Sequence, residues 1–154
     1  MNTNQLKRFA QAARLKLIDQ IGAKLEKVLT SDSTELREKA SEIKQLQEAI
    51  NSSSKQQVVD TVAYTWFNRF VALRFMDVNG YEPISIKVVS PLENATLPEL
   101  LQEAKAGNIP QELVVNHQRI YQILDGTIPS SNAQNEAYRE LLVGACNHLH
   151  TVFP

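Results

Sequence analysis

The pattern of apolar and polar positions divides the chain into amphipathic segments, and the most apolar of these lies near the middle. Within residues 57–79, two apolar stripes recur at helical spacing. One stripe consists of Val59, Val62, Ala63, Trp66, Phe70 and Leu73, and the other of Tyr64, Phe67, Val71, Phe75 and Val78. A helix that is apolar on two sides is expected to have neighbours on both. The spacing therefore predicts a central helix, which Asn79-Gly80 ends with a left-handed cap.

The remaining segments are predicted to cover this central helix. Helical periodicity extends over residues 4–29, 33–50, 97–106, 111–124 and 133–150. The first two should form an antiparallel hairpin, and a coiled-coil partner surface on the second is the alternative. Between Pro83 and Pro91 the apolar positions alternate instead, which predicts a short extended segment at 84–89. Together these patterns predict an all-α bundle of five or six helices, forming a single domain over residues 1–154.

Composition narrows the class of protein. The 154 residues are 43% hydrophobic and 21% charged, which is typical of a globular chain. The net charge of −1 provides no overall positive field for nucleic acid. A single cysteine excludes an internal disulfide and fits a reducing compartment, so a cytoplasmic location is expected. No apolar run approaches the roughly 20 residues of a membrane span, and no secretory signal precedes the first helix, so no membrane partner is expected.

Basic residues at two places are candidates for contact with DNA phosphate or with another protein domain. Lys7, Arg8 and Arg14 precede the first acidic residue of the chain, so they oppose the dipole of the first helix and suggest an anionic neighbour. Arg69 and Arg74 interrupt the apolar faces of the central helix. The alternative interpretation is a solvated polar surface, which is what charged residues on helices usually form.

The catalytic and metal-binding patterns in the sequence are weak. Cys146, His148 and His150 share one predicted helix, but only the first and last lie on one face. A structural zinc site needs four ligands, so neither a metal nor a cysteine nucleophile is predicted. The glycines are too widely spaced for either phosphate-binding motif, so no cofactor site is predicted in this chain.

Three blocks of sequence resemble the PglX family. The members of this family are adenine-specific DNA methyltransferases of BREX phage-defence systems. The strongest block is AYTWFNRFVALRFMDVNGY at 63–81. The other two are MNTNQLKRFAQAAR at 1–14 and EAYRELLVGACNHLHTVFP at 136–154. In this family the catalytic domain follows the region that the last block resembles.

The resemblance implies that this chain is the N-terminal helical part of such an enzyme. The parent would transfer a methyl group from S-adenosylmethionine to adenine in DNA. The Asn-Pro-Pro-Tyr motif that holds the flipped adenine in such enzymes is absent here, because no two prolines are adjacent. This fragment is therefore expected to be inactive and to bind no S-adenosylmethionine. Its implied partners are the catalytic domain of the same protein, DNA and other phage-defence proteins.

The rival hypothesis is a free-standing helical interaction or regulatory module without enzymatic activity. The two hypotheses differ in what they predict for the end of the chain. An independent module should close its last helix on its own core. A fragment should leave an apolar patch near Leu149, Val152 and Phe153.

Overall fold

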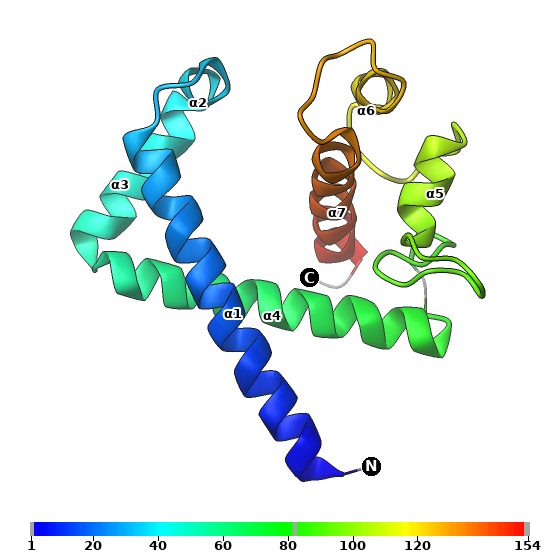
Figure 1. Cartoon of the computed structure of the whole chain (residues 1–154), viewed down its shortest axis with the longest axis horizontal. Coiled ribbons are helices and arrows are strands. Elements are labelled where there is room, and N and C mark those ends of the chain that lie inside the picture. The colour runs from blue at the N-terminus through cyan, green and yellow to red at the C-terminus, as the bar shows by residue number, and fades with distance from the viewer. Residues whose placement is uncertain (1, 82, 153–154) are drawn as a thin grey trace. The chain divides into compact units, whose positions relative to one another are not determined.

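The computed structural model describes residues 2–81 and 83–152, and within these ranges every regular element is a helix (Figure 1). The prediction of an all-α fold is therefore confirmed. The chain groups into two compact units, Met1–Asn68 and Arg69–Pro154. The fourth helix, α4 (Lys55–Asn79), contributes residues to both units.

Unit 1 contains α1 (Thr3–Thr30), α2 (Thr34–Glu38), α3 (Ala40–Ser52) and the first part of α4. The Asn2 side chain caps α1 by accepting a hydrogen bond from the Asn4 amide at 3.1 Å. Two short helices replace the single one predicted over 33–50, because the backbone leaves the α conformation at Lys39. The Lys39 amide donates to the Leu36 carbonyl, which forms a tighter turn between α2 and α3.

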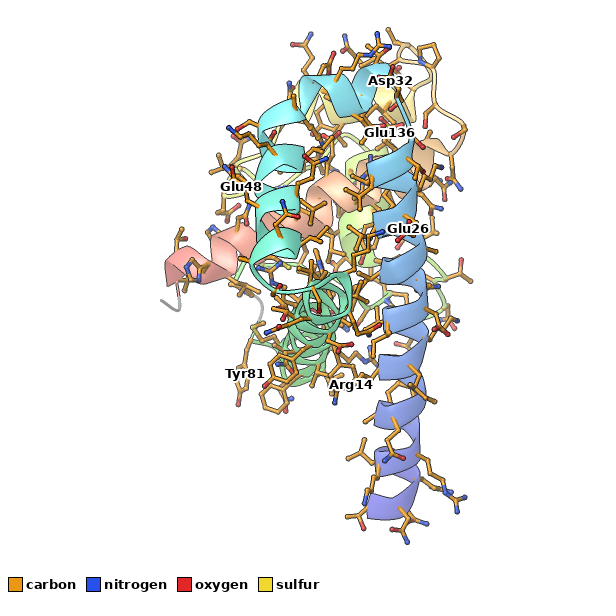
Figure 2. The ribbon with its side chains drawn as sticks, turned by 90° about the vertical axis from the view of Figure 1, so that its left-hand side faces the viewer. Arg14, Glu26, Asp32, Glu48, Tyr81 and Glu136 are labelled. Carbon is orange, nitrogen blue, oxygen red and sulfur yellow. The ribbon has the colours of Figure 1, made fainter. Side chains whose placement is uncertain are left out.

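The apolar core of unit 1 is small. Among its described residues only Leu25, Val59 and Ala63 are buried hydrophobic side chains. Figures 1 and 2 show α3 running back alongside the C-terminal half of α1. An apolar pocket of about 290 Å³ remains between these helices and α4, lined by Ile21, Lys24, Leu25, Val28, Leu46, Val58, Val59, Val62 and Trp66. Unit 1 therefore gains little stability from its own packing.

Unit 2 has a much fuller core. It contains the end of α4 together with α5 (Glu99–Lys105), α6 (His117–Leu124) and α7 (Ala133–Val152). Helix α7 packs against both α5 and α6. The side chains that are almost completely inaccessible to solvent include Leu73, Ile84, Val88, Leu100, Leu113, Ile120, Ile123 and Leu141. The loops between the helices add to this core, because Ile84, Val88 and Leu113 lie outside any helix.

Helix α4 is buried on one side only, which corrects the prediction that neighbours pack on both of its apolar stripes. From the first stripe, Val59, Ala63 and Leu73 are buried, whereas Phe70 is exposed. From the second stripe, Tyr64, Val71, Phe75 and Val78 are exposed. The helix ends as predicted: Gly80 has a φ of 70°, and the Tyr81 amide reaches back to the Met76 carbonyl at 3.0 Å.

The segment at 84–89 is a series of turns and bends, so the extended segment predicted there is wrong. Its backbone amides do not pair with a neighbouring strand. The amides of Val88 and Val89 donate instead to the carboxylate of Asp77. Ile84 and Val88, four residues apart, are the apolar side chains that become buried. Alternation of apolar residues indicated an extended chain, but hydrogen bonds to a helix side chain determined its course.

Candidate interaction surfaces

Part of the second stripe of α4, in unit 2, presents several large apolar side chains to solvent. We call it the α4 face and define it by Val71, Phe75, Val78 and Tyr81, whose exposed fractions lie between 51% and 63%. The first three follow each other at four and three residues on the helix, so they share one side. The rings of Phe75 and Tyr81 are in contact, with centroids 6.2 Å apart and planes tilted by 46°. Contiguous apolar surface of this kind marks an interaction site more often than scattered exposed residues do.

The predicted basic residues of the first helix are all exposed. Lys7, Arg8 and Arg14 lie in the N-terminal half of α1, which extends past the part that α3 accompanies (Figure 2). Lys7 and Arg14 are two helical turns apart and lie on the same side, whereas Arg8 points to a different side. The first turn of α1 contains no acidic residue. This end of the helix is therefore positive through both its side chains and its dipole.

The two predicted arginines of α4 lie in unit 2 and take part in its internal interactions. Arg74 donates from Nη1 to the Oγ of Ser90, which holds the following loop against the helix. Arg69 acts electrostatically on Cys146 of α7. Both residues remain exposed in part, so their surfaces stay available for contact. Their positions on α4 differ by five residues, which places them on different sides of the helix.

The sequence patterns missed a buried carboxylate that organises the loop after α4. Asp77 is only 4% exposed. One of its oxygens accepts the Val88 amide at 2.9 Å, and the other accepts the amides of Val89 at 2.9 Å and Ser90 at 2.8 Å. Consecutive amides that converge in this way form an anion-binding concavity, which Asp77 itself fills. Its position one turn after Leu73, on the buried stripe, was the available signal.

A second polar anchor joins the same loop to α7. The hydroxyl of Tyr138 donates to the Val88 carbonyl at 2.9 Å. Burial raises the pKa of Tyr138 to about 12, and the nearby charge of Asp77 contributes further. The phenol is therefore held in its protonated, hydrogen-bond-donating form, which suits a structural role better than acid–base chemistry near neutral pH.

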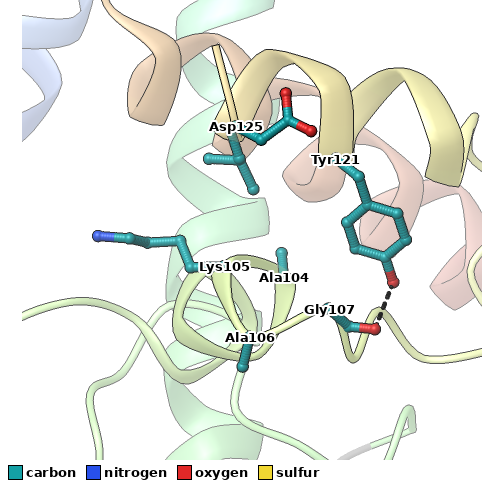
Figure 3. A pocket seen from close by; sticks show the side chains of 7 residues that line it. Ala104, Lys105, Ala106, Gly107, Tyr121 and Asp125 are labelled. Atoms are coloured by element: carbon teal, nitrogen blue, oxygen red, sulfur yellow. Dashed lines mark hydrogen bonds between the residues drawn. The ribbon is translucent and has the colours of Figure 1, made fainter. Parts of the chain in front are cut away.

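A pocket of about 380 Å³ lies where α5 and α6 end (Figure 3). It is lined by Ala104, Lys105, Ala106, Gly107, Tyr121, Leu124 and Asp125. The Tyr121 hydroxyl is already engaged, since it donates to the Gly107 carbonyl at 2.9 Å and accepts the Ile109 amide at 3.0 Å. The lining offers small apolar groups, one lysine and one carboxylate, without a nucleophile beside a base.

The environment of Cys146 does not favour nucleophilic chemistry. Burial raises the pKa of the Cys146 thiol, and the Arg69 guanidinium opposes this rise in part. A thiol with a raised pKa is a poor nucleophile. Within residues 2–81 and 83–152 no group of three or more His, Cys, Asp and Glu side chains could hold a metal ion. No helix in the described part of the chain combines the length and apolar character that a membrane crossing requires.

The patch expected at the end of the chain is described only in part. Leu149 is half-buried and Val152 is exposed, while Phe153 lies outside the described residues.

Adenine-specific methyltransferases are the class of protein that this chain resembles. The chain is 29% identical, over 187 aligned positions, to the adenine-specific methyltransferase PglX of Lacticaseibacillus casei (strain Zhang). That match covers the whole chain and 15% of PglX. It is 33% identical over 97 residues to the adenine-specific methyltransferase BrxX of Escherichia coli O9:H4 (strain HS), covering 63% of the chain and 8% of BrxX. The resemblance predicted from three blocks of sequence is confirmed. The chain spans only a small fraction of the length of these relatives.

No protein-family model and no solved structure matches the chain significantly.

Proposed function

We propose that this chain is the non-catalytic helical part of a PglX-like adenine-specific DNA methyltransferase and acts as a scaffold for the catalytic part. The match along the whole chain to a protein of which it covers 15% supports this proposal. The parent would transfer a methyl group from S-adenosylmethionine to adenine in DNA, in the cytoplasm, as part of phage defence. S-adenosylmethionine would bind in the catalytic part, because the motifs that handle cofactor and adenine are missing from this chain.

The observation that best supports the scaffold role is the exposed apolar α4 face. Burial of a Val or Phe side chain that would otherwise be exposed is worth up to about 1.5–3 kcal/mol. Three such side chains and the Tyr81 ring lie together on one side of α4. Their combined burial against a neighbouring domain would offset the loss of freedom on docking, whereas their exposure in isolation offers no compensating interaction.

A chimera tests the scaffold role. This chain would replace the matching segment of the Lacticaseibacillus casei PglX, and adenine methylation of host DNA would be measured by sequencing. The chimera should methylate DNA, and Val71→Asp should abolish methylation by placing a charge in the buried interface. Val114→Asp is the matched control, because Val114 is 95% exposed in the same unit, and it should leave methylation unchanged.

Two outcomes would overturn the proposal. Equal methylation by the Val71→Asp and Val114→Asp chimeras would remove the α4 face from any interface with the catalytic part. Transfer of radiolabelled methyl groups by the isolated chain would contradict its non-catalytic role. The isolated chain should instead give the background signal of a reaction without protein.

A further inference from the structure

The N-terminal half of α1 combines exposed apolar residues with an unusually one-sided charge. Leu6 and Phe9 are 49% and 66% exposed. The cations of this half are Lys7, Arg8, Arg14 and Lys16, and the first acidic residue is Asp19. The helix dipole adds further positive potential at this end, since the first turn contains no acid.

These features have a definite arrangement around the helix axis. Leu6, Ala10 and Ala13 follow each other at spacings of four and three, so they form one apolar line, with Phe9 beside it. At 100° per residue, Lys7 and Arg14 fall along one edge of this line and Lys16 along the other. Arg8 and Leu15 fall on the opposite side of the helix. Ala10 and Ala13 are half-buried, so the exposed apolar part of this side is Leu6 with Phe9 beside it.

We propose that the N-terminal half of α1 is a docking site for an acidic amphipathic helix of a second protein. Apolar residues of that helix would cover Leu6 and Phe9. Its Asp and Glu residues, placed at the borders of its apolar stripe, would lie beside Lys7, Arg14 and Lys16. Flanking charges of opposite sign are what determine partner choice when two helices pack along such a line.

Charge distinguishes this occupant from the alternatives. A second copy of the chain would bring the same cations against each other, in either orientation, and like charges in such positions repel. Duplex DNA would satisfy the cations, but it would leave Leu6 and Phe9 exposed to water. An acidic amphipathic helix would both pair with the cations and cover the exposed apolar side chains. This inference does not depend on the methyltransferase assignment.

The test uses designed peptides of equal length as probes. One is an amphipathic helix with Leu along its stripe and Glu at both borders, and the other has Lys in place of Glu. Binding of each fluorescently labelled peptide to the whole chain would be measured by anisotropy at low and at physiological salt. The acidic peptide should bind at least about tenfold more tightly than the basic one, which corresponds to about 1.4 kcal/mol.

Matched variants separate a specific docking surface from general attraction. Lys7→Glu and Arg8→Glu change the net charge equally and lie one residue apart, but only Lys7 borders the apolar line. Lys7→Glu should weaken acidic-peptide binding about tenfold, whereas Arg8→Glu should change it less than about threefold. Leu6→Ser should weaken binding, and Leu15→Ser, at an exposed leucine on the opposite side, should not.

Three results would overturn the proposal. The acidic peptide could fail to bind even at low salt. The variants on the two sides of α1 could weaken binding equally, which would indicate diffuse electrostatic attraction. A short duplex DNA could bind in a strongly salt-dependent manner while the acidic peptide does not, which would assign this half of α1 to phosphate contact.

Discussion

Asp77 fixes the course of the loop that follows α4. A carboxylate that is almost fully buried is costly unless its oxygens are hydrogen-bonded, and here three backbone amides satisfy them. The same interaction supplies partners for amides that no strand or helix pairs. Ser90 is held twice, because its amide donates to Asp77 and its hydroxyl accepts from Arg74. Removing the charge should therefore disturb both the helix end and the loop.

We expect Asp77→Asn to destabilise the protein by about 2–4 kcal/mol, because it loses charge-assisted hydrogen bonds and turns an amide donor toward other donors. Urea unfolding followed by circular dichroism measures this change. Asp125→Asn is the matched control, since Asp125 also accepts a backbone amide, from Thr127 at 2.8 Å, but is exposed. The control should change stability little. Equal effects of the two substitutions would contradict the anchoring role of Asp77.

Tyr138 should make stability fall at alkaline pH. Its folded-state pKa of about 12 lies above the ordinary value of about 10, so the folded protein retains the phenol proton that the unfolded chain loses. The stabilising contribution is thus complete below about pH 10 and is lost as the pH rises toward 12. Urea unfolding across this range should show a steeper loss for the wild type than for Tyr138→Phe. Parallel pH profiles would exclude this linkage.

At the scale of elements, periodicity located the helices but could not decide what covers each face. The first stripe of α4 was predicted to be buried, and Val59, Ala63 and Leu73 are, whereas Phe70 is exposed. The second stripe looked equivalent in sequence, yet nothing within the described chain buries Phe75 or Val78. Amphipathicity records which surfaces a complete molecule or assembly buries, and it does not distinguish an internal neighbour from a partner.

The candidate contact residues were similarly predictable only as residue types. The sequence identified the cations of α1 and α4, because they stand out from apolar or acid-free stretches. It could not show that Arg74 holds Ser90, since that hydrogen bond joins residues 16 apart through a loop. The anchor at Asp77 was missed for the same reason. Its three partners are backbone amides, which have no signature in the sequence.

Gly144 of α7 is a residue at which tertiary packing overrides helix propensity. Glycine inside a helix costs about 1 kcal/mol relative to alanine. Here a Cβ atom would collide with the side chain of Val115, which precedes α6. We expect Gly144→Ala to destabilise by a net amount of about 1–2 kcal/mol, because overpacking outweighs the gain in helix propensity.

A double-mutant cycle with Val115→Ala checks the cause of this effect. If the collision is responsible, the double variant should be more stable than the sum of the two single changes predicts. If Gly144→Ala alone stabilised the protein, the contact with Val115 would not be what requires glycine at this position.

At the scale of the whole chain, the two units differ greatly in the apolar surface that they bury. The described core of unit 1 consists of Leu25, Val59 and Ala63, while unit 2 buries side chains from four helices and two loops. Since burial of apolar surface is the main favourable term in folding, unit 1 should be the less stable part. A lower stability of unit 1 would fit a segment whose exposed faces are completed by partners, as we propose for α1.

This difference predicts two separable unfolding transitions. Trp66 belongs to unit 1, where it lines the apolar pocket, and is the only tryptophan, so its fluorescence reports chiefly on the packing of that unit, whereas circular dichroism reports both units. During urea unfolding, the fluorescence change should precede most of the dichroism change. Leu25→Ala should shift the fluorescence transition to lower urea and leave the later step in place, and Leu141→Ala should do the reverse, since each deletes buried volume from one core. Coincident transitions that move together in both variants would mean that α4 couples the units into one cooperative structure.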